Sequence, residues 1–191
     1  MRRARCVFGG RRGCVKFCYQ EPANVAWRAP SISVQVITPD VDAGGLLAGA
    51  QFVDAYTLTI EDTTLDARGA AERMFNSLPA WISGLMAVRN FVVTPFGLKT
   101  AIPRQTGARD VIGFFPVVSQ SPDRLVAGFD DKHLDFRVVV DIAPEGSARR
   151  VTATTLVRTH NLLGRLYLAA VLPFHRIIVR AMLRQLLEPR G

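Results

Sequence analysis

Four stretches of alternating apolar and polar residues, separated by three short turn sequences, occupy residues 111–159. The turns QSPD, DDK and APEGSA consist largely of residues that favour tight chain reversal. Connections this short can join only antiparallel neighbours. The sequence therefore predicts an antiparallel meander, with strands at about 111–119, 124–130, 133–142 and 149–159.

Period-two alternation gives this meander one apolar and one polar face. The apolar face is expected to contain Ile112, Phe114, Val118, Leu125, Ala127, Phe129, Leu134, Phe136, Val138, Val140, Ile142, Val151, Ala153 and Val157. The reverse face carries His133, Asp135, Arg137 and Asp141, opposite Arg150, Thr152, Thr154 and Arg158. A solvated polar face is the favoured interpretation, because antiparallel sheets commonly keep one. An alternative interpretation is that His133, Asp135 and Arg137 bind an anion or a partner molecule.

A strand and two helices precede the meander. The segment QFVDAYTLTIE is rich in β-branched and aromatic residues and predicts a strand from Gln51. The next segment has helical periodicity, with Thr63 or Thr64 as its expected cap. Pro79 should end this helix and begin a second one, PAWISGLMAVRNFVV. Residues 95–110 are expected to form a long loop.

A long helix is expected to close the chain, with His160 and Asn161 at its start. Its uninterrupted apolar run, Leu166 to Phe174, covers nine residues, whereas a membrane span needs about 20. We therefore expect no transmembrane segment. Pro173 should kink or divide the helix. Beyond it, the arginines Arg176, Arg180 and Arg184 form a stripe, and the broader apolar side, which should cover the sheet, contains Phe174, Ile178, Val179, Ala181, Met182 and Leu186.

The first 48 residues are expected to be a disordered extension of a single domain at 49–188. They contain all three cysteines, Cys6, Cys14 and Cys18, without a histidine to complete a zinc site. No apolar run of about 7–15 residues follows the arginine pairs, so a signal peptide is not expected. A predicted core without cysteine fits a cytoplasmic protein.

The net charge of +8 is unevenly distributed along the chain. Residues 29–148 hold nine basic and fourteen acidic side chains, a net −5, whereas residues 149–191 hold eight basic residues against Glu188, a net +7. Because the middle of the chain is acidic, we expect no nucleic-acid binding.

Several word-length motifs follow one another in a familiar order: PAWISGLMAVRNFVVTPFGLK, GFFPVVSQ, FDDKHLDFRVVV and TLVRTHNLLGRLYLAAVLPFHRIIVRAML. Over about residues 50–187 they resemble a bacterial family of uncharacterised proteins assigned to the START-like SRPBCC superfamily. The resemblance implies an α+β helix-grip fold, in which a curved antiparallel sheet wraps around the C-terminal helix and two helices follow the first strand. It also implies a deep apolar cavity between sheet and helix, as in lipid-transfer proteins, hormone-binding proteins and polyketide cyclases.

Related domains are sometimes joined to nicotinamide-binding oxidoreductase domains. This chain has no G-x-G-x-x-G after a strand, so such a domain would have to be a separate oxidoreductase partner.

Polar residues at apolar positions are the candidate ligand contacts. Arg89 lies within the apolar stripe of the second helix, and a structural partner such as Asp54 is favoured over a ligand carboxylate or phosphate. His175 lies on the apolar side of the last helix, where a hydrogen-bonded core histidine is favoured over a ligand or a base. The further candidates are Tyr56, Trp81, Phe114, Phe136 and Tyr167.

The residues form no conventional catalytic set. The three histidines are scattered, and neither H-E-x-x-H nor G-x-S-x-G occurs, so we expect no metal and no cofactor. The leading hypothesis is binding of a hydrophobic small molecule, either neutral or acidic, such as a lipid, fatty acid or polyketide-like compound. Arg89 or His175 would hold its polar head.

Two alternatives stay open. One is a cyclase- or dehydratase-like enzyme that uses His175 or Tyr56 for proton transfer in the same cavity. The other is a partner or membrane-surface module that uses the basic final helix. The sequence does not indicate an oligomeric state.

Overall fold

The computed structural model describes residues 33–76, 80–82, 84, 110–113 and 115–188. Its elements are β1 (Gln35–Ile37), α1 (Ala43–Leu46), β2 (Phe52–Ile60), α2 (Ala67–Asn76), β3 (Val111–Ile112), β4 (Phe115–Gln120), β5 (Arg124–Asp130), β6 (Leu134–Glu145), β7 (Ala148–Thr159), α4 (Leu162–Arg184) and the 3-10 turn η2 (Gln185–Leu187). Residues 80–82 and 84 are also helical.

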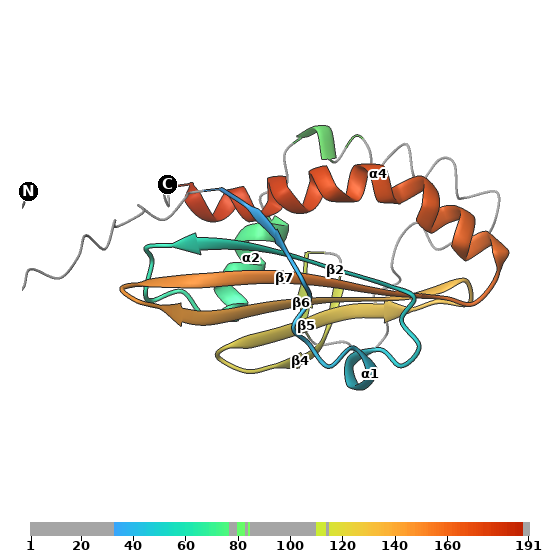
Figure 1. The fold of residues 1–191 in the computed structure, drawn as a ribbon, viewed down its shortest axis with the longest axis horizontal. Helices are drawn as coiled ribbons and strands as arrows, with labels where there is room; N and C mark the ends of the chain where they lie inside the picture. The colour runs from blue at the N-terminus through green and yellow to red at the C-terminus, as the bar shows by residue number, and fades with distance from the viewer. Residues whose placement is uncertain (1–32, 77–79, 83, 85–109, 114, 189–191) are drawn as a thin grey trace, which may run out of the picture.

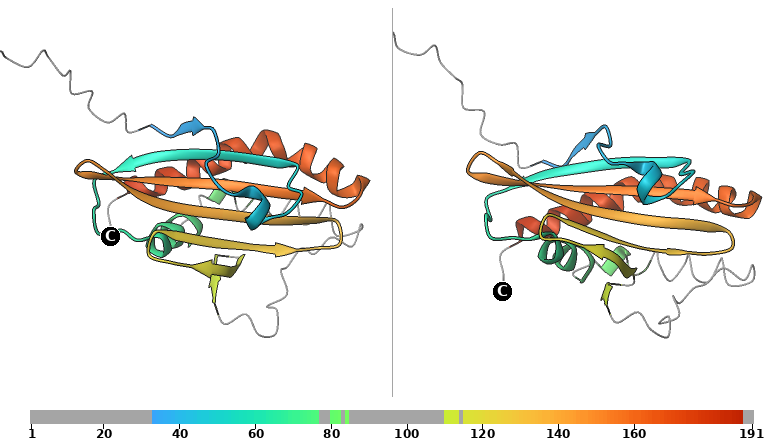
Figure 2. Two further views of the ribbon diagram at one scale, coloured as in Figure 1. Left: turned by 60° about the horizontal axis from the view of Figure 1, so that its bottom comes forward. Right: turned by 90° about the horizontal axis from the view of Figure 1, so that it is seen from below.

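The strands form one seven-stranded antiparallel sheet in the order β1-β2-β7-β6-β5-β4-β3. Helices α2 and α4 pack on one face, here called the inner face, and α1 lies on the other, the outer face (Figures 1 and 2). The α+β class and the long C-terminal helix over the sheet are as predicted. The two longest strands, β6 and β7, pair over their whole length, which makes them the centre of the sheet.

The main core lies between the inner face, α2 and the second half of α4. Strand register places apolar residues side by side across the sheet, for example Leu125 opposite Val140 and Val140 opposite Ala153. The buried core residues include the predicted Ala127, Val138, Ile142, Val151, Ile112 and Met182. The alternation of the meander is therefore confirmed over most of its length. Phe114 lies outside the described residues.

The strand expected at 111–119 is two strands instead. Gly113, with a φ of +58°, allows the chain to reverse, and Ile112 pairs with Phe115. Because this reversal pairs an even-numbered residue with an odd-numbered one, Phe115 and Val117 lie on the core side of β4 and Val118 is exposed. The expectation that Val118 faces the core is wrong, because a chain reversal inside the expected strand exchanges the two faces.

Helix α2 is capped by a different residue from the one predicted. The Asp66 carboxylate accepts a hydrogen bond from the Gly69 amide at 2.8 Å, and the helix begins at Ala67. Thr64 instead donates its hydroxyl to Asp62 at 2.7 Å. Asp66, which directly precedes the first helical residue, is therefore the N-cap in place of Thr63 or Thr64. The buried side of α2, Ala67, Ala70, Ala71, Met74 and Phe75, is the predicted one.

Residues 33–48, expected to lie outside the domain, are part of the fold. Strand β1 pairs with β2, and α1 leads into Leu47, which is buried on the outer face against Val126 and Leu156. The outer face is therefore not wholly polar, and its apolar patch needs a cover. Residues 1–32, with the three cysteines, lie outside the described residues.

The start of α4 rests directly on the turn that leads into β6. Asn161 caps the helix, as predicted, by accepting a hydrogen bond from the Gly164 amide at 3.0 Å, and its Nδ2 donates to the Lys132 carbonyl at 3.2 Å. The His160 amide donates to the His133 carbonyl at 2.9 Å. Gly164 has no room for a side chain, because a Cβ there would lie 2.1 Å from the same carbonyl oxygen.

Pro173 lies inside α4, which continues through it to Arg184 and is not divided. Val179, Met182 and Leu183 on the later turns are buried, and Arg176, Arg180 and Arg184 are exposed, as predicted. Phe174 was expected on the covered side but is largely exposed. The side of α4 that contacts the sheet is thus narrower than its apolar composition suggested.

Gly164→Ala should lower the free energy of unfolding by about 1–3 kcal/mol, because the added methyl group meets rigid backbone. The matched control is Gly84→Ala, whose Cβ would have no atom within 4 Å. That control should be neutral or stabilising by up to about 1 kcal/mol, since alanine favours helix. Urea unfolding measures both. Equal stability of the two variants would contradict the close contact of α4 with the β6 turn.

Candidate functional site

A carboxylate and an imidazole meet between β2 and α4. Strand β2 directs Phe52, Asp54 and Tyr56 toward the inner face, in phase with the buried Leu58 and Ile60. His175 Nε2 lies 3.1 Å from the Asp54 carboxylate oxygens. The two side chains are only 15% and 17% exposed, so this polar pair is mostly withdrawn from water.

The surroundings of His175 orient its ring. Phe52 meets the imidazole edge-on, with ring centroids 5.8 Å apart and an interplanar angle of 83°. In the tautomer that donates from Nε2 to Asp54, the other ring nitrogen, Nδ1, carries the acceptor lone pair. Asp54 thus determines which nitrogen of His175 can accept a proton or a hydrogen bond from a ligand.

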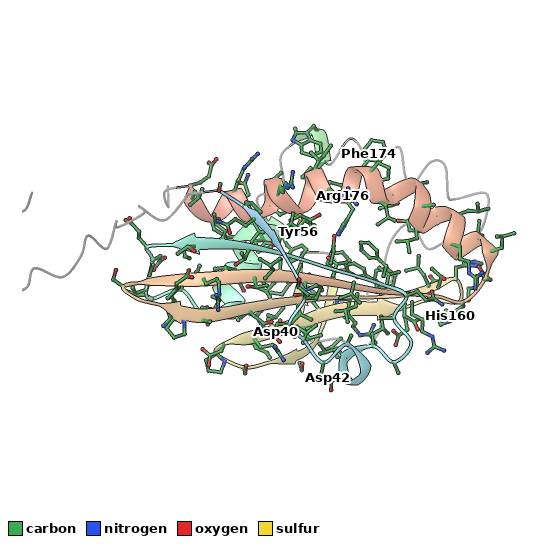
Figure 3. All side chains as sticks on the ribbon, viewed as in Figure 1. Asp40, Asp42, Tyr56, His160, Phe174 and Arg176 are labelled. Carbon is green, nitrogen blue, oxygen red and sulfur yellow. The ribbon has the colours of Figure 1, made fainter. Side chains whose placement is uncertain are left out.

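Tyr56 extends this pair into a cluster of three polar side chains. Burial raises the pKa of Tyr56 above 10.0, and the Asp54 charge and a hydrogen bond to Asp54 raise that pKa further. The charges of Arg176 and Arg180 act in the opposite direction. The Arg180 guanidinium lies 5.8 Å from the centroid of the Tyr56 ring. Figure 3 shows Tyr56 on the sheet, with Arg176 on the helix above it.

An aromatic floor adjoins this cluster on the inner face. Phe52 pairs with Val157, Val157 pairs with Phe136, and Phe136 pairs with Phe129, so these four residues form one row across the sheet. The rings of Phe129 and Phe136 are 5.7 Å apart, and Phe115 packs 5.1 Å from Phe136. Phe115, Phe129 and Phe136 are all only partly buried. The polar cluster therefore lies at the end of an apolar surface.

The structure brings together only some of the predicted site residues. His175, Tyr56 and Phe136 share the inner face, and Tyr167 is partly buried on α4. Trp81 is exposed, whereas Arg89 and Phe114 lie outside the described residues. The sequence interpretation considered Asp54 only as a partner for Arg89. The available signal was its position, because Asp54 occupies an inward-facing place in an otherwise apolar strand phase.

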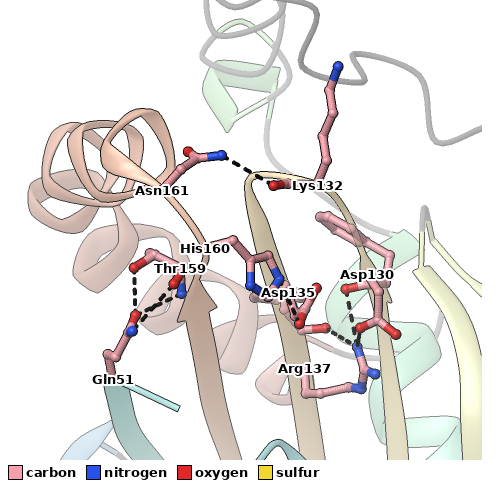
Figure 4. Close-up of polar contacts among 10 residues, drawn as sticks. Gln51, Asp130, Lys132, Asp135, Arg137, Thr159, His160 and Asn161 are labelled. Atoms are coloured by element: carbon pink, nitrogen blue, oxygen red, sulfur yellow. Dashed lines mark hydrogen bonds and ion pairs between the residues drawn. The ribbon is translucent and has the colours of Figure 1, made fainter. Parts of the chain in front are cut away.

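On the outer face, Asp135 and Arg137 contact their neighbours (Figure 4), and His133 lies in the turn before β6. Asp135 pairs with His160 Nε2 at 2.9 Å, and Arg137 pairs with Asp130 at 2.6 Å. His133 Nδ1 lies 3.0 Å from the side-chain amide of Asn161. Because Asp135 and Arg137 already have partners, the geometry favours their structural interpretation over the grip on an anion. His133 Nε2, in contrast, is buried without a hydrogen-bond partner among the described residues.

A hollow of about 580 Å³ lies on the outer side of the sheet, beside the segment that leads into α1. The Arg124–Asp141 ion pair, at 2.5 Å, lines it together with Asp40 and Thr152. Among the described residues, no group of three or more His, Cys, Asp or Glu side chains could hold a metal ion. The mixed polar lining distinguishes this hollow from the apolar inner surface.

Comparison with protein families gives one match. The sequence profile of the family described as "Protein of unknown function (DUF2867)" matches residues 46–182. The matched region runs from the end of α1 through most of α4, and it includes Asp54, Tyr56 and His175. A search of curated proteins found no match.

The Tyr56 pKa provides a direct test of the cluster. In Asp54→Asn, the pKa of Tyr56 should fall toward 10.0, because the carboxylate charge is removed while burial remains. Ultraviolet absorbance during a pH titration measures it, and Tyr56→Phe identifies the signal. In the wild type, stability should decline as the pH rises above 10.0, because the unfolded chain ionises first.

Asp135→Asn, on the outer face, is the control for this titration and should leave the Tyr56 pKa unchanged. If Asp54→Asn also leaves it unchanged, Asp54 and Tyr56 do not interact as the structure indicates.

Proposed function

Because this chain belongs to the DUF2867 family of proteins of unknown function, we propose a function from the site itself: binding of a hydrophobic small molecule between the inner face and α4. The observation that carries the proposal is the His175–Asp54–Tyr56 cluster at the end of a partly exposed aromatic floor. Ligand sites typically combine apolar walls with a few converging polar groups. The fold supports this function, because a helix laid over a sheet encloses such a site from two sides.

The apolar floor would provide most of the affinity. Covering apolar surface contributes about 25 cal/mol per Å² removed from water, and phenylalanine side chains have large surfaces to contribute. The partly buried state of Phe115, Phe129 and Phe136 leaves such surface for a ligand. Chain length and shape of the ligand would therefore matter for affinity.

The polar cluster would hold the head group. It offers an imidazole nitrogen, a tyrosine hydroxyl and two nearby guanidinium groups, from Arg176 and Arg180. These two positive charges face the single negative charge of Asp54. An acidic head group such as a carboxylate fits this balance better than a cationic one, because it restores neutrality.

The proposal includes membership of the START-like SRPBCC superfamily and a cytoplasmic location. The antiparallel sheet with its long C-terminal helix is consistent with a helix-grip-like fold. A separate oxidoreductase partner remains part of the hypothesis, because a protein that holds a hydrophobic compound can present it to an enzyme. The ligand itself would then be the substrate of that partner.

A second candidate function is catalysis in the same place. A histidine that donates from one ring nitrogen to a carboxylate is the usual arrangement of a general base, and the His175–Asp54 distance of 3.1 Å meets its geometric requirement. Tyr56 would then be available as a proton donor, since its raised pKa keeps it protonated at neutral pH. This geometry supports a cyclase- or dehydratase-like proton transfer.

Native mass spectrometry of the purified full chain, followed by extraction, should reveal a bound hydrophobic compound. In calorimetry, fatty acids should bind more tightly than fatty alcohols of equal chain length. Arg180→Gln should weaken acid binding by about 10- to 100-fold, the usual effect of losing a hydrogen bond to a charged group. His133→Gln on the outer face should leave the affinity unchanged.

The absence of a co-purified ligand, together with no binding across fatty acids, fatty alcohols and aromatic polyketide-like acids, would contradict the binding function. Incubation with a polyketide-like substrate separates the two candidates, because a binding protein saturates without forming product. Product formation that His175→Gln abolishes, with binding retained, would instead establish the enzyme.

A further inference from the structure

The side of α4 that faces away from the sheet is largely apolar from Leu162 to Ile177. Leu162 is 70% exposed, Leu166 59%, Phe174 48% and Ile177 58%. Ala169, Ala170 and Pro173, between them, are exposed as well. A surface helix of a soluble protein normally presents polar residues on this side, so the patch needs a functional explanation.

The same helix is strongly basic. Arg165, Arg176, Arg180 and Arg184 are exposed, and α4 contains no aspartate or glutamate. Within α4, the only charged side chains beside the exposed apolar patch are therefore positive. Large apolar side chains combined with arginines are typical of helices that lie in the surface of an anionic bilayer.

Helix α4 and η2 together, Leu162–Leu187, are also long and apolar enough to cross a membrane by length and composition alone. The fold argues for a different placement. Val179, Met182 and Leu183 are buried in the core, and the cap at Asn161 holds the other end to the β6 turn. A helix packed on the sheet at both ends can expose one side to lipid but cannot cross the bilayer.

We propose that the outer side of α4 docks on the surface of an anionic lipid bilayer. Leu162, Leu166, Phe174 and Ile177 enter the boundary between head groups and acyl chains, and Arg165 and Arg184 contact lipid phosphates. The exposed Trp81 belongs to a helical segment on the same side of the sheet (Figure 1) and suits the membrane interface.

The positive charge of α4 favours an anionic bilayer over a second copy of the chain as the partner of this surface. Two α4 helices face to face would bring arginines together without a single acidic residue of α4 to pair with them. Anionic lipids supply the missing negative charge. The docking is independent of ligand binding, and it would place the helix above the His175 cluster at a source of hydrophobic compounds.

Co-sedimentation of the full chain with vesicles tests the proposal. The protein should bind phosphatidylcholine vesicles that contain phosphatidylglycerol, bind pure phosphatidylcholine much less, and dissociate at high salt. The triple variant Leu166→Ser, Phe174→Ser, Ile177→Ser keeps every charge. Its affinity for the vesicles should be at least about tenfold lower than that of the wild type. In the double variant Arg165→Gln, Arg184→Gln, the affinity for the anionic vesicles should fall by about fivefold for each arginine removed.

The matched control carries Val36→Ser and Val118→Ser, two exposed apolar residues outside α4, and should bind like the wild type. Circular dichroism verifies that every variant remains folded. Two vesicle results would overturn the proposal: no binding at all, or equal binding by the wild type and the triple apolar variant. Two further results would also overturn it. One is resistance of the membrane-bound protein to alkaline extraction, and the other is a dimer in sedimentation velocity that the triple apolar variant no longer forms.

Discussion

The placement of α4 over the sheet is the constraint on which the rest of the molecule depends. At its start, Asn161 and Gly164 hold the helix against the turn into β6, where there is no space even for a methyl group. At its end, Met182 and Leu183 are buried in the core that α2 shares. Between these two anchors the helix has little freedom, so the intervening side chains occupy defined positions above the sheet.

His175 owes its position to these anchors. An ionised carboxylate at a mostly buried place such as Asp54 is costly unless a partner compensates it, and the cost can reach several kcal/mol. The imidazole, the Tyr56 hydroxyl and the nearby arginines provide that compensation. An apolar side chain at this point of β2 would avoid that cost, so the carboxylate supports the proposal of a role in recognition or chemistry.

The two sides of α4 have different chemistry. The inner side carries the histidine and the late core residues, while the outer side carries the exposed leucines, Phe174, Arg165 and Arg184. The sheet is divided in the same way, since its inner face continues into the aromatic floor and its outer face carries ion pairs around Asp135 and Arg137. A hydrophobic ligand and a lipid surface would thus engage opposite sides of a single helix.

Local patterns were enough to predict the meander, the buried side of α2, the Asn161 cap and the inward direction of His175, because each depends on residues close in sequence. Tertiary structure decided the rest. The partner of His175 is 121 residues away, the outer-face patch around Leu156 determines that residues 33–48 belong to the fold, and the reversal between β3 and β4 exposes Val118. Periodicity reports which side of an element is apolar, but only the packing of elements decides which surface covers that side and which polar groups meet there.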